Sequence, residues 1–385
     1  MQNMLVTLLL LILLICTFFI IYSYCIYPLL LSLFARLFKK KAIFDNGYQP
    51  SVGVVVPVYN EEKVIKGKIE NILSMAYPPD KISIWIGSDQ STDGTNDIVT
   101  AFDDERVHLW VAPKRGGKTE VLNKLVPRVD AEIIFLTDAN TMHKADCLKK
   151  MIGYYADPAV GAVLGRVKHI IKEGNDFAEN IYRTFEVWQK KLESNLHSAI
   201  AAFGGFYTIR KEYFRPIPFN AYSNDDVLIP MNIIRQKKRI IFEYDAVSEE
   251  DATGYLRTEF YRRIRIGAGN FQAFFWLLDF LVPFRGWSSF CYISHKVFRW
   301  FSPFAIIGCY VSLGLLSVTS NVLIFKLLLA LALIVLLLFG TYKLFKPKIV
   351  RPLYYFFAMN IALFFGFFRY LGGIKSAAWA RTKRS

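Results

Sequence analysis

The chain has 385 residues, of which 54% are hydrophobic and 16% aromatic, and it carries a net charge of +15. Its mean hydropathy of +0.29 excludes an ordinary soluble protein of this length and predicts membrane segments. Basic membrane flanks account for the positive charge, and no basic helix or aromatic-basic sheet motif suggests a nucleic-acid partner. The five cysteines form no C-x-x-C pair, so we interpret them as packing residues.

The first apolar run extends from Met4 to Ile26, which is long enough to span a bilayer as a helix. It has no basic residue before it and no small-x-small cleavage site, so we interpret it as a retained anchor and reject a cleaved signal peptide. The basic flank Ala35 to Lys41 follows it. The positive-inside rule therefore predicts an outward N-terminus and a cytoplasmic domain after an anchor region at residues 1–41.

Residues 42–255 have the composition of a soluble domain, with short β-branched runs separated by amphipathic stretches. This pattern predicts a Rossmann-like α/β domain with a mostly parallel sheet. Helices are expected at Glu61 to Leu73, capped by Asn60, and at Thr119 to Val126. The predicted strands are Val52 to Pro57, Ile82 to Asp89, Val107 to Val111, Glu132 to Asp138 and Gly161 to Val167.

The strand with the sequence EIIFLTD ends on Asp138, and Asn140 follows two positions later. In open α/β sheets, ligands bind outside the carboxyl ends of the strands. We therefore expect Asn60, Asp89 and Asp138 to surround one crevice.

The chain returns to apolar composition after residue 255. In the segment 256–298, Phe271 to Phe284 is too short to span a bilayer and predicts an interfacial amphipathic helix. The region 299–385 contains two or three further spans, because basic clusters at Lys343 to Arg351 and Arg381 to Arg384 flank the last run on both sides. That run is either re-entrant or leaves the tail outside. The candidate runs are Phe301 to Val318, Val322 to Tyr342 and Leu353 to Tyr370.

Several polar motifs have ordinary structural explanations when each is taken alone. SDQSTDGT, which contains Asp89, fits a strand-to-helix loop, and RGGK, which ends on Lys118, fits either a solvated loop or a phosphate contact. Asp225 and Asp226 could simply cap a helix. The arginines of RTEFYRRIR fit a lipid-facing surface, although Arg262 and Arg265 share one helix face and could clamp a diphosphate.

The order of these motifs resembles that of the membrane-bound family 2 glycosyltransferases with a GT-A domain. The motifs are PVYNE, D-x-S-x-D-G-T, R-G-G-K-x-x-x-L-N, T-D-A-N, G-G-F-Y-T-I-R-K-E, D-D-V-L and R-x-x-R, with a closing WARTKR. This group includes cellulose, chitin, hyaluronan and poly-N-acetylglucosamine synthases and ceramide glucosyltransferases. The resemblance is strong over about residues 45–300 and looser in the membrane tail.

The resemblance implies an inverting transfer in which Asp226 is the general base, with a nucleotide-sugar donor and a divalent cation, Mn²⁺ or Mg²⁺, as cofactor. Asp138 and Asn140 would contact that metal. The donor site implied by the resemblance consists of Pro57, Tyr59, Glu61, Asp89, Lys118, Asp138, Arg262 and Arg265. In this site Asp89 would hold the nucleobase of the donor. The acceptor side consists of Gly204, Gly205, Phe206 and Asp225.

Two positions depart from the family pattern. Asn140 replaces the second acid of the D-x-D motif, so one expected carboxylate ligand becomes an amide oxygen. We expect the metal to bind weakly before the nucleotide arrives, with the diphosphate completing its ligand shell. Ile266 replaces the Trp that packs under the acceptor sugar in polymer-making relatives, which makes such an acceptor platform doubtful.

The resulting expectation is a multi-pass protein of the bacterial inner membrane that transfers a sugar, expected to be UDP-linked, to a glycan or lipid acceptor. One alternative is a processive synthase that needs a partner subunit. Another is an inactive nucleotide-sugar-binding scaffold, which the two departures would favour and the retained acids and arginines oppose. A transporter is disfavoured because the apolar runs after the domain lack mid-membrane charges.

Overall fold

The computed structural model describes residues 2–170, 177–222, 224–251, 256–282, 285–345 and 350–373. Predictions about the closing motif at Trp379 to Arg384, most of the basic cluster at Lys343 to Arg351, and the side chain of Arg257 fall outside the part that can be described.

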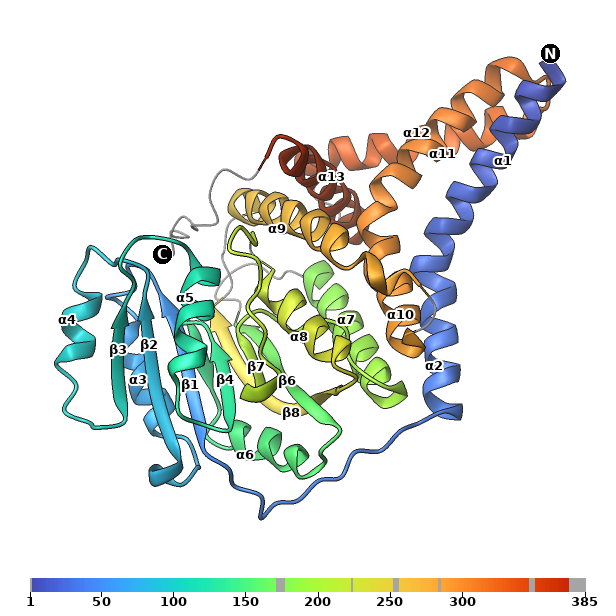
Figure 1. Ribbon diagram of the computed structural model, residues 1–385. Helices are drawn as coiled ribbons and strands as arrows, with labels where there is room; N and C mark the ends of the chain where they lie inside the picture. Colours follow the sequence, from blue (N-terminus) through green and yellow to red (C-terminus); the bar gives the residue numbers. More distant parts are fainter. Residues whose placement is uncertain are drawn as a thin grey trace.

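An eight-stranded mixed sheet with the order β3-β2-β1-β4-β7-β6-β8-β5 forms the centre of the domain (Figure 1). The first four strands in this order are parallel, β7 is antiparallel to β4 and β6, and β6 and β8 are parallel. All five predicted strands are present, as β1 (Val52–Val58), β2 (Ile82–Ser88), β3 (Val107–Val111), β4 (Ile133–Thr137) and β6 (Val160–Ile170). The remaining strands are β5 (Thr141–His143), β7 (Phe206–Arg210) and β8 (Arg239–Asp251).

Helices cover both faces of the sheet, and each face has its own hydrophobic core. One face is covered by α5 (Lys118–Leu125), α7 (Phe177–Leu196) and α8 (Asp225–Arg235). The other is covered by α3 (Ile65–Leu73), α4 (Thr95–Thr100) and α6 (Cys147–Ile152). This arrangement confirms the Rossmann-like α/β architecture.

The predicted cap at Asn60 is wrong. Helix α3 begins at Ile65, four residues after the predicted start at Glu61, and no side chain caps it. Asn60 has a positive φ of 56°, and its side-chain oxygen accepts a 2.7 Å hydrogen bond from the Thr92 backbone amide. Asn60 therefore connects the loops that follow β1 and β2. Its side chain bonds to the loop after β2 and does not bond to α3.

Four helical segments in the described part of the chain are long and apolar enough to cross a membrane: Gln2–Leu37, Trp287–Thr319, Leu323–Tyr342 and Arg351–Leu371. The first consists of α1 (Gln2–Ile21), a π-helical turn (Tyr22–Ile26) and α2 (Tyr27–Leu37), and the others contain α10 (Trp287–Cys291), α11 (Phe298–Thr319), α12 (Leu323–Phe345) and α13 (Arg351–Leu371). In Figure 1, α1, α11 and α12 project away from the domain. The three predicted C-terminal runs are thus all helical.

Helix α2 packs against the α/β domain, because Tyr27, Leu31 and Ala35 are buried in the same core as residues of α7 and α8. The predicted anchor region therefore also packs against the α/β domain.

The predicted interfacial helix has different bounds. Helix α9 spans Leu256–Trp276, and a short 3-10 turn follows at Leu278–Phe280. The aromatic rings of Phe271 and Phe280 are fully buried in the protein, and Asp279 pairs with Arg235 of α8 at 2.5 Å. Phe275 and Leu278 of the same segment are 46% and 45% exposed, so its position at the membrane interface stays a prediction.

Candidate active site

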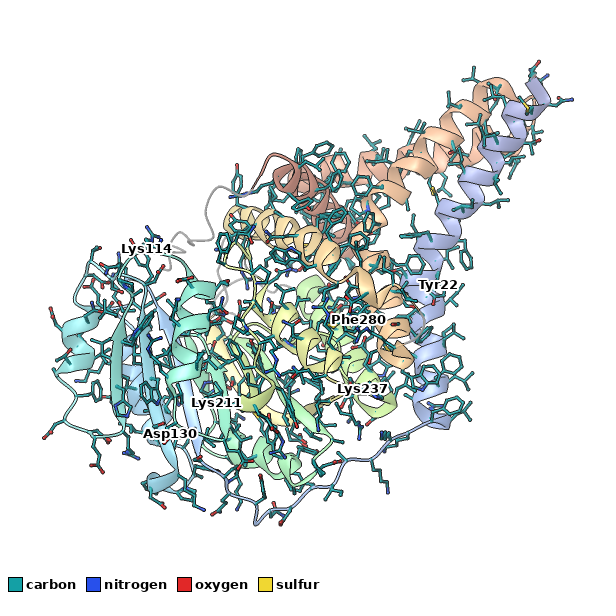
Figure 2. The ribbon with its side chains drawn as sticks, in the orientation of Figure 1. Tyr22, Lys114, Asp130, Lys211, Lys237 and Phe280 are labelled. Atoms are coloured by element: carbon teal, nitrogen blue, oxygen red, sulfur yellow. The ribbon has the colours of Figure 1, made fainter. Side chains whose placement is uncertain are left out.

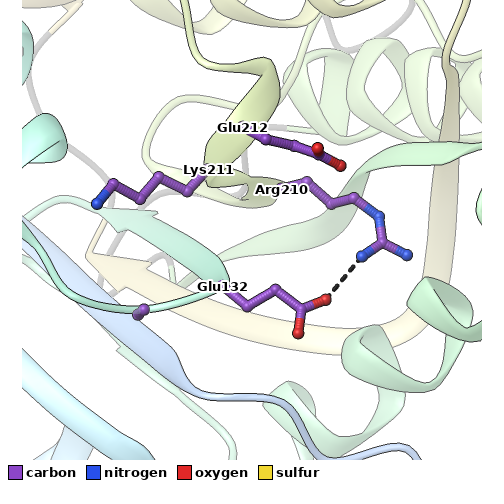
Figure 3. Close-up of a pocket in the computed structure, with 5 residues that line it drawn as sticks. Glu132, Arg210, Lys211 and Glu212 are labelled. Carbon is purple, nitrogen blue, oxygen red and sulfur yellow. Dashed lines mark hydrogen bonds and ion pairs between the residues drawn. The ribbon is translucent and has the colours of Figure 1, made fainter.

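The candidate residues gather at the carboxyl edge of the parallel strands. Lys114, just before α5, lies near this edge, whereas Asp130 and Lys211 lie at the opposite one (Figure 2). A surface pocket at that opposite edge is crossed by a 2.7 Å ion pair between Arg210 and Glu132 (Figure 3). It contains none of the predicted donor or acceptor residues.

Lys118 joins two of the predicted acids. Its Nζ lies 2.8 Å from Asp138 Oδ1 and 3.0 Å from Asp225 Oδ2. Burial lowers the pKa of Lys118, but the two carboxylates outweigh burial and raise it overall. Lys118 begins α5, Asp138 follows β4 and Asp225 begins α8, so three separate elements bring these charges together.

Asp89 fixes the loop that carries Lys118. It follows β2, is 1% exposed, and accepts backbone hydrogen bonds from Gly116 at 2.7 Å and Gly117 at 2.9 Å. Gly117 has a φ of 86°, a conformation that favours glycine, which explains the second glycine of the RGGK motif. Burial raises the pKa of Asp89, although the two amides oppose this change.

The end of β1 forms an adjacent wall of the crevice. Pro57 is within β1 opposite Gly87 of β2, and Tyr59 lies just beyond it. The guanidinium of Arg115 stacks on the Tyr59 ring at 3.7 Å from the centroid. The backbone amide of Glu61 donates to Thr95 Oγ1 at 2.8 Å. Tyr59 thus contacts the loop that Asp89 holds, whereas Pro57 and Glu61 contact β2 and the start of α4 (Thr95–Thr100).

Asp226 lies in the first turn of α8, beside Asp225. Its Oδ2 accepts a 3.2 Å hydrogen bond from the backbone amide of Gly204, which precedes β7. Burial and the charge of Asp225 raise the pKa of Asp226 from its ordinary value of 3.8 to about 7, against the opposing effects of Lys118 and Lys190. The sequence alone does not reveal this desolvation, because burial of the carboxylate is a property of the fold.

Asn140 is held by an acid that the sequence analysis missed. Its Nδ2 donates to Glu250 Oε1 at 2.6 Å, and the pairing of β5 with β8 places Thr141 opposite Glu250. Asp138 is also closely packed, since a Cβ on Gly205 would lie 2.5 Å from its carboxyl carbon. Gly205 is therefore required by the close approach of β7 to the end of β4.

A buried lysine supports the turn between β4 and β5. The Nζ of Lys68, on α3, donates to Thr137 Oγ1 at 2.9 Å and lies 2.8 Å from His143 Nε2. Burial lowers the pKa of Lys68 to about 7. Both contacts join residues about seventy positions apart, so no local sequence signal could have identified them.

Arginines from two helices face the same region. Arg262 and Arg265 lie on α9, as predicted, and Arg369 of α13 donates to the hydroxyl of Tyr222 at 2.6 Å. Burial lowers the pKa of Arg265. The charges of Arg262 and Arg369 lower this pKa further, and the charge of Asp138 opposes them. The buried Nε of Arg265 has no hydrogen-bond partner among the described atoms. This concentration of positive charge suits an anionic ligand.

Close helix packing brings these arginines together. A Cβ on Gly366 of α13 would lie 2.8 Å from the Gly267 backbone of α9, and a Cβ on Gly269 would lie 2.1 Å from the Tyr222 carbonyl oxygen. The sequence analysis missed Arg369 because it assigned α13 to the membrane alone.

The prediction that Phe206 lies on the acceptor side is wrong for its ring. Phe206 is fully buried in the core and packs against Phe135 and His143, with ring centroids 5.7 and 5.0 Å apart. Successive side chains of β7 point to opposite faces of the sheet, and the Phe206 ring points into the core that covers one of them. Gly204 is exposed, and Asp225 is 6% exposed and paired with Lys118.

The mixed sheet, with acids at its carboxyl edge and arginines beside them, forms a GT-A-like domain. Residues 53–217 match the family model "Glycosyl transferase family 2", so the chain contains a family 2 glycosyltransferase domain.

Known proteins agree with this assignment. The chain is 33% identical to the beta-monoglucosyldiacylglycerol synthase of Synechocystis sp. over 33% of its own length and 27% of that protein. It is 32% identical to the probable glycosyltransferase YdaM of Bacillus subtilis over 31% of its own length and 30% of that protein. The chain thus spans only about a third of these curated relatives.

The whole fold also has a solved counterpart. The mannosyltransferase PcManGT from Pyrobaculum calidifontis, solved in complex with GDP-Man and Mn²⁺, superposes with a TM-score of 0.70 at 22% identity. The match covers 94% of this chain and 99% of that one. At this identity the likeness establishes the fold.

Proposed function

We propose that the protein is an inverting glycosyltransferase that moves a sugar from a nucleoside-diphosphate sugar to a hydroxyl group of a membrane-associated glycan or glycolipid. The observation that carries this proposal is the convergence of Lys118, Asp138 and Asp225 beside Asp226 at one sheet edge, with Arg265 close by. This set combines a carboxylate suited to proton removal with cations suited to a leaving diphosphate.

In the proposed reaction, Asp226 accepts the proton of the acceptor hydroxyl as its oxygen attacks the anomeric carbon. The bond between that carbon and the phosphate oxygen breaks, and the nucleoside diphosphate leaves with its electron pair. Lys118, Arg262 and Arg265 balance the charge that develops on the diphosphate. Asp89 holds the loop of Lys118 in place through two backbone amides.

A divalent cation fits the oxygen-bearing side chains at the end of β4. Asp138 and Asn140 would hold it, and when bound it would supply positive charge against the diphosphate. Among the described residues, no three His, Cys, Asp or Glu side chains are grouped to hold a metal ion. The donor's phosphate oxygens would therefore complete the ligand shell, which makes metal binding dependent on nucleotide.

The contact between Asn140 and Glu250 predicts how Mn²⁺ affinity changes when the amide and the carboxylate are exchanged. Glu250→Gln should weaken Mn²⁺ binding in the presence of nucleoside diphosphate about tenfold, as loss of a supporting carboxylate near a metal commonly does. The double variant Asn140→Asp/Glu250→Gln should recover most of that loss, because the carboxylate and the amide exchange places across the 2.6 Å contact. Electron paramagnetic resonance titration of free Mn²⁺ measures both affinities without turnover. Equal Mn²⁺ affinity in the Glu250→Gln variant would contradict this prediction.

The membrane helices support a membrane-linked acceptor. Helix α9, which carries Arg262 and Arg265, packs along α13, one of the four helices apolar enough to cross a membrane. The proposed donor site therefore lies beside the membrane region, where a lipid-linked hydroxyl can approach. We propose a multi-pass protein of the bacterial inner membrane with a cytoplasmic catalytic domain.

The test is nucleotide release by the detergent-purified full chain with UDP-, GDP- and dTDP-sugars, each with Mn²⁺, Mg²⁺ or EDTA and with a membrane lipid extract as acceptor. We expect one donor class to release nucleotide in the presence of metal, and EDTA to stop release. Tight nucleotide binding without release from any donor, in the presence of the extract, would argue against the transferase and favour an inactive scaffold.

A further inference from the structure

Helix α7 contains a buried lysine that no element of the proposed reaction uses. Lys190 is 1% exposed, and its Nζ donates to the carbonyl oxygen of Ile200 at 2.9 Å and to that of Ala201. The same ammonium lies 4.7 Å from the centroid of the Phe203 ring. All three partners belong to the loop at residues 200–204, which connects α7 with β7. A single side chain thus holds most of this loop.

The other side of the loop holds Asp226. The Ala202 amide donates to the Asp226 carbonyl oxygen at 2.7 Å, and the Gly204 amide donates to its carboxylate at 3.2 Å. Ala201 has a φ of 64°, a conformation that an alanine adopts only when its surroundings impose it. Lys190 binds the carbonyl oxygens of Ala201 itself and of the preceding Ile200. These two hydrogen bonds hold Ala201 in this conformation.

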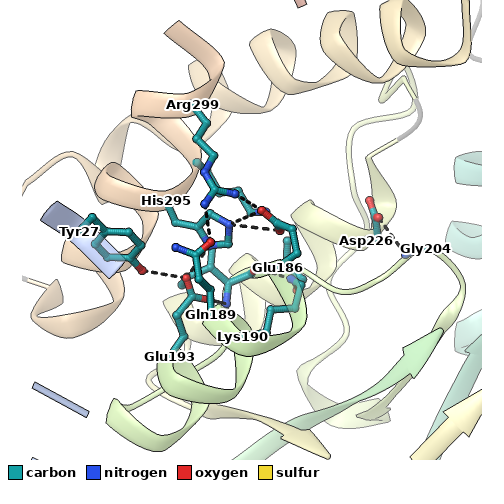
Figure 4. Close-up of polar contacts among 12 residues, drawn as sticks. Tyr27, Glu186, Gln189, Lys190, Glu193, Gly204, Asp226, His295 and Arg299 are labelled. Atoms are coloured by element: carbon teal, nitrogen blue, oxygen red, sulfur yellow. Dashed lines mark hydrogen bonds and ion pairs between the residues drawn. The ribbon is translucent and has the colours of Figure 1, made fainter. Parts of the chain in front are cut away.

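Helix α7 is itself fixed by a buried charge cluster (Figure 4). Glu193, one turn after Lys190, accepts hydrogen bonds from the Ile200 amide at 3.0 Å and from the Tyr27 hydroxyl at 2.9 Å. His295 bridges Glu193 at 2.5 Å and Glu186 at 3.0 Å, and Glu186 also pairs with Arg299. Tyr27 begins α2, His295 lies in the π-helical segment Tyr292–Val297 before α11, and Arg299 lies in the first turn of α11.

We propose that Lys190 is a positioning residue for Asp226. It holds the 200–204 loop so that the Gly204 amide meets the Asp226 carboxylate, and the charge cluster ties this arrangement to the membrane helices. The inference rests on the proposed function, in which Asp226 is the general base. In Figure 4 the cluster lies on one side of the loop and the contact between Gly204 and Asp226 lies on the other.

The charged and titratable groups around Asp226 define what a change at position 190 should do. Asp225 on the same helix raises the pKa of Asp226, while Lys118 of α5, Lys190 of α7 and the Gly204 amide lower it. The buried hydroxyl of Tyr207 on β7 also faces these acids. Burial lowers the pKa of Lys190 itself to about 7, so Lys190 is charged below that pH. Its removal therefore raises the pKa of Asp226 further over the acidic limb.

The test compares Lys190→Met with Lys191→Met in the full chain in nanodiscs. Lys191 is the neighbouring exposed lysine, whose ammonium lies over the Tyr244 ring. For Lys190→Met we expect kcat to fall about tenfold to a hundredfold, the size of a partly lost general-base contribution. The donor KM should change less than threefold, and the acidic limb of the pH profile of kcat/KM should move to higher pH. Lys191→Met should match the unmodified protein in all three.

A purely structural role would lower the unfolding midpoint of Lys190→Met but leave kcat per folded molecule and the acidic limb unchanged, and that result would overturn the proposal. If Lys190→Met does not fold, Gly204→Ala disturbs the same loop from its other end. Gly204 has a φ of 52° with open space around its Cα, so alanine there strains the backbone without a clash. The same upward move of the acidic limb is expected, and an unchanged limb would refute the inference.

Failure of the two proposals can be told apart. Absence of nucleotide release from every donor by the unmodified protein would remove the proposed function. Near-normal turnover of Asp226→Asn would leave that function standing but remove Asp226 as the general base, and this inference with it. An inactive Asp226→Asn variant together with an unaltered Lys190→Met variant would remove this inference alone.

Discussion

Asp226→Asn is expected to lower sugar transfer about 10²-fold to 10⁴-fold, the range that a positioned general base contributes. Asparagine keeps the shape of the side chain and can still meet the Gly204 amide through its oxygen, but it cannot accept the acceptor's proton. Nucleotide binding should stay within about threefold, since no cation of the proposed diphosphate site is changed. The measurement is single-turnover transfer beside equilibrium titration with nucleoside diphosphate.

The pH dependence of the unmodified protein provides a second check on Asp226. Because burial and Asp225 raise the pKa of Asp226 to about 7, the base is protonated below that pH. We expect kcat/KM to fall tenfold per pH unit below about pH 7 and to level off above it. A flat profile between pH 5 and pH 8 would contradict the assignment.

The same pKa shift determines the effect on stability. A carboxyl group whose pKa is higher in the folded state favours folding while it is protonated, and this advantage is lost as pH rises from 3.8 to about 7. Asp226→Asn removes the charge that opposes folding above this range. At pH 8 its thermal unfolding midpoint should equal or exceed that of the unmodified protein, so loss of activity cannot be attributed to unfolding.

Lys118→Met is expected to have the second large effect, a loss of about 10²-fold to 10³-fold in transfer, as for removal of one preorganised charge-stabilising group. Lys118 contacts Asp138 and Asp225 within 3.0 Å, so its removal leaves two neighbouring carboxylates without their shared cation. Repulsion between them should displace Asp138 and weaken binding of nucleoside diphosphate more than binding of nucleoside monophosphate. The ratio of the two inhibition constants measures this effect.

The matched control for Lys118→Met is Lys114→Met, because Lys114 is an exposed lysine of the same loop. The control should lose less than twofold of transfer. The acidic limb should also move upward in Lys118→Met, since Lys118 lowers the pKa of Asp226. Equal losses in both variants would show that general positive charge, and not the contact with the two acids, is what matters.

The parallel half of the sheet could be predicted from the sequence because each of its strands is a short, mostly apolar run with a turn after it. Val107–Val111 was found with the expected bounds, and the acids that follow β2 and β4 meet at one edge because parallel strands share their direction. The long strand Arg239–Asp251 was missed. Its many charged residues give no apolar alternation, and its pairing with β6 stabilises it instead.

The sequence by itself determined the apolar helices, the α/β domain and the candidate acids and arginines that lie in motifs, since each depends on composition, periodicity or motif order along a local stretch. It did not indicate Glu250 or Arg369. Only the tertiary structure decided which groups touch. Lys118 with Asp225, Asn140 with Glu250 and Lys190 with the loop of Asp226 join elements distant along the chain or across a turn. Such contacts depend on the packing of helices and strands against one another. The raised pKa of Asp226 follows the same rule, because desolvation is a property of the folded site and not of the residue.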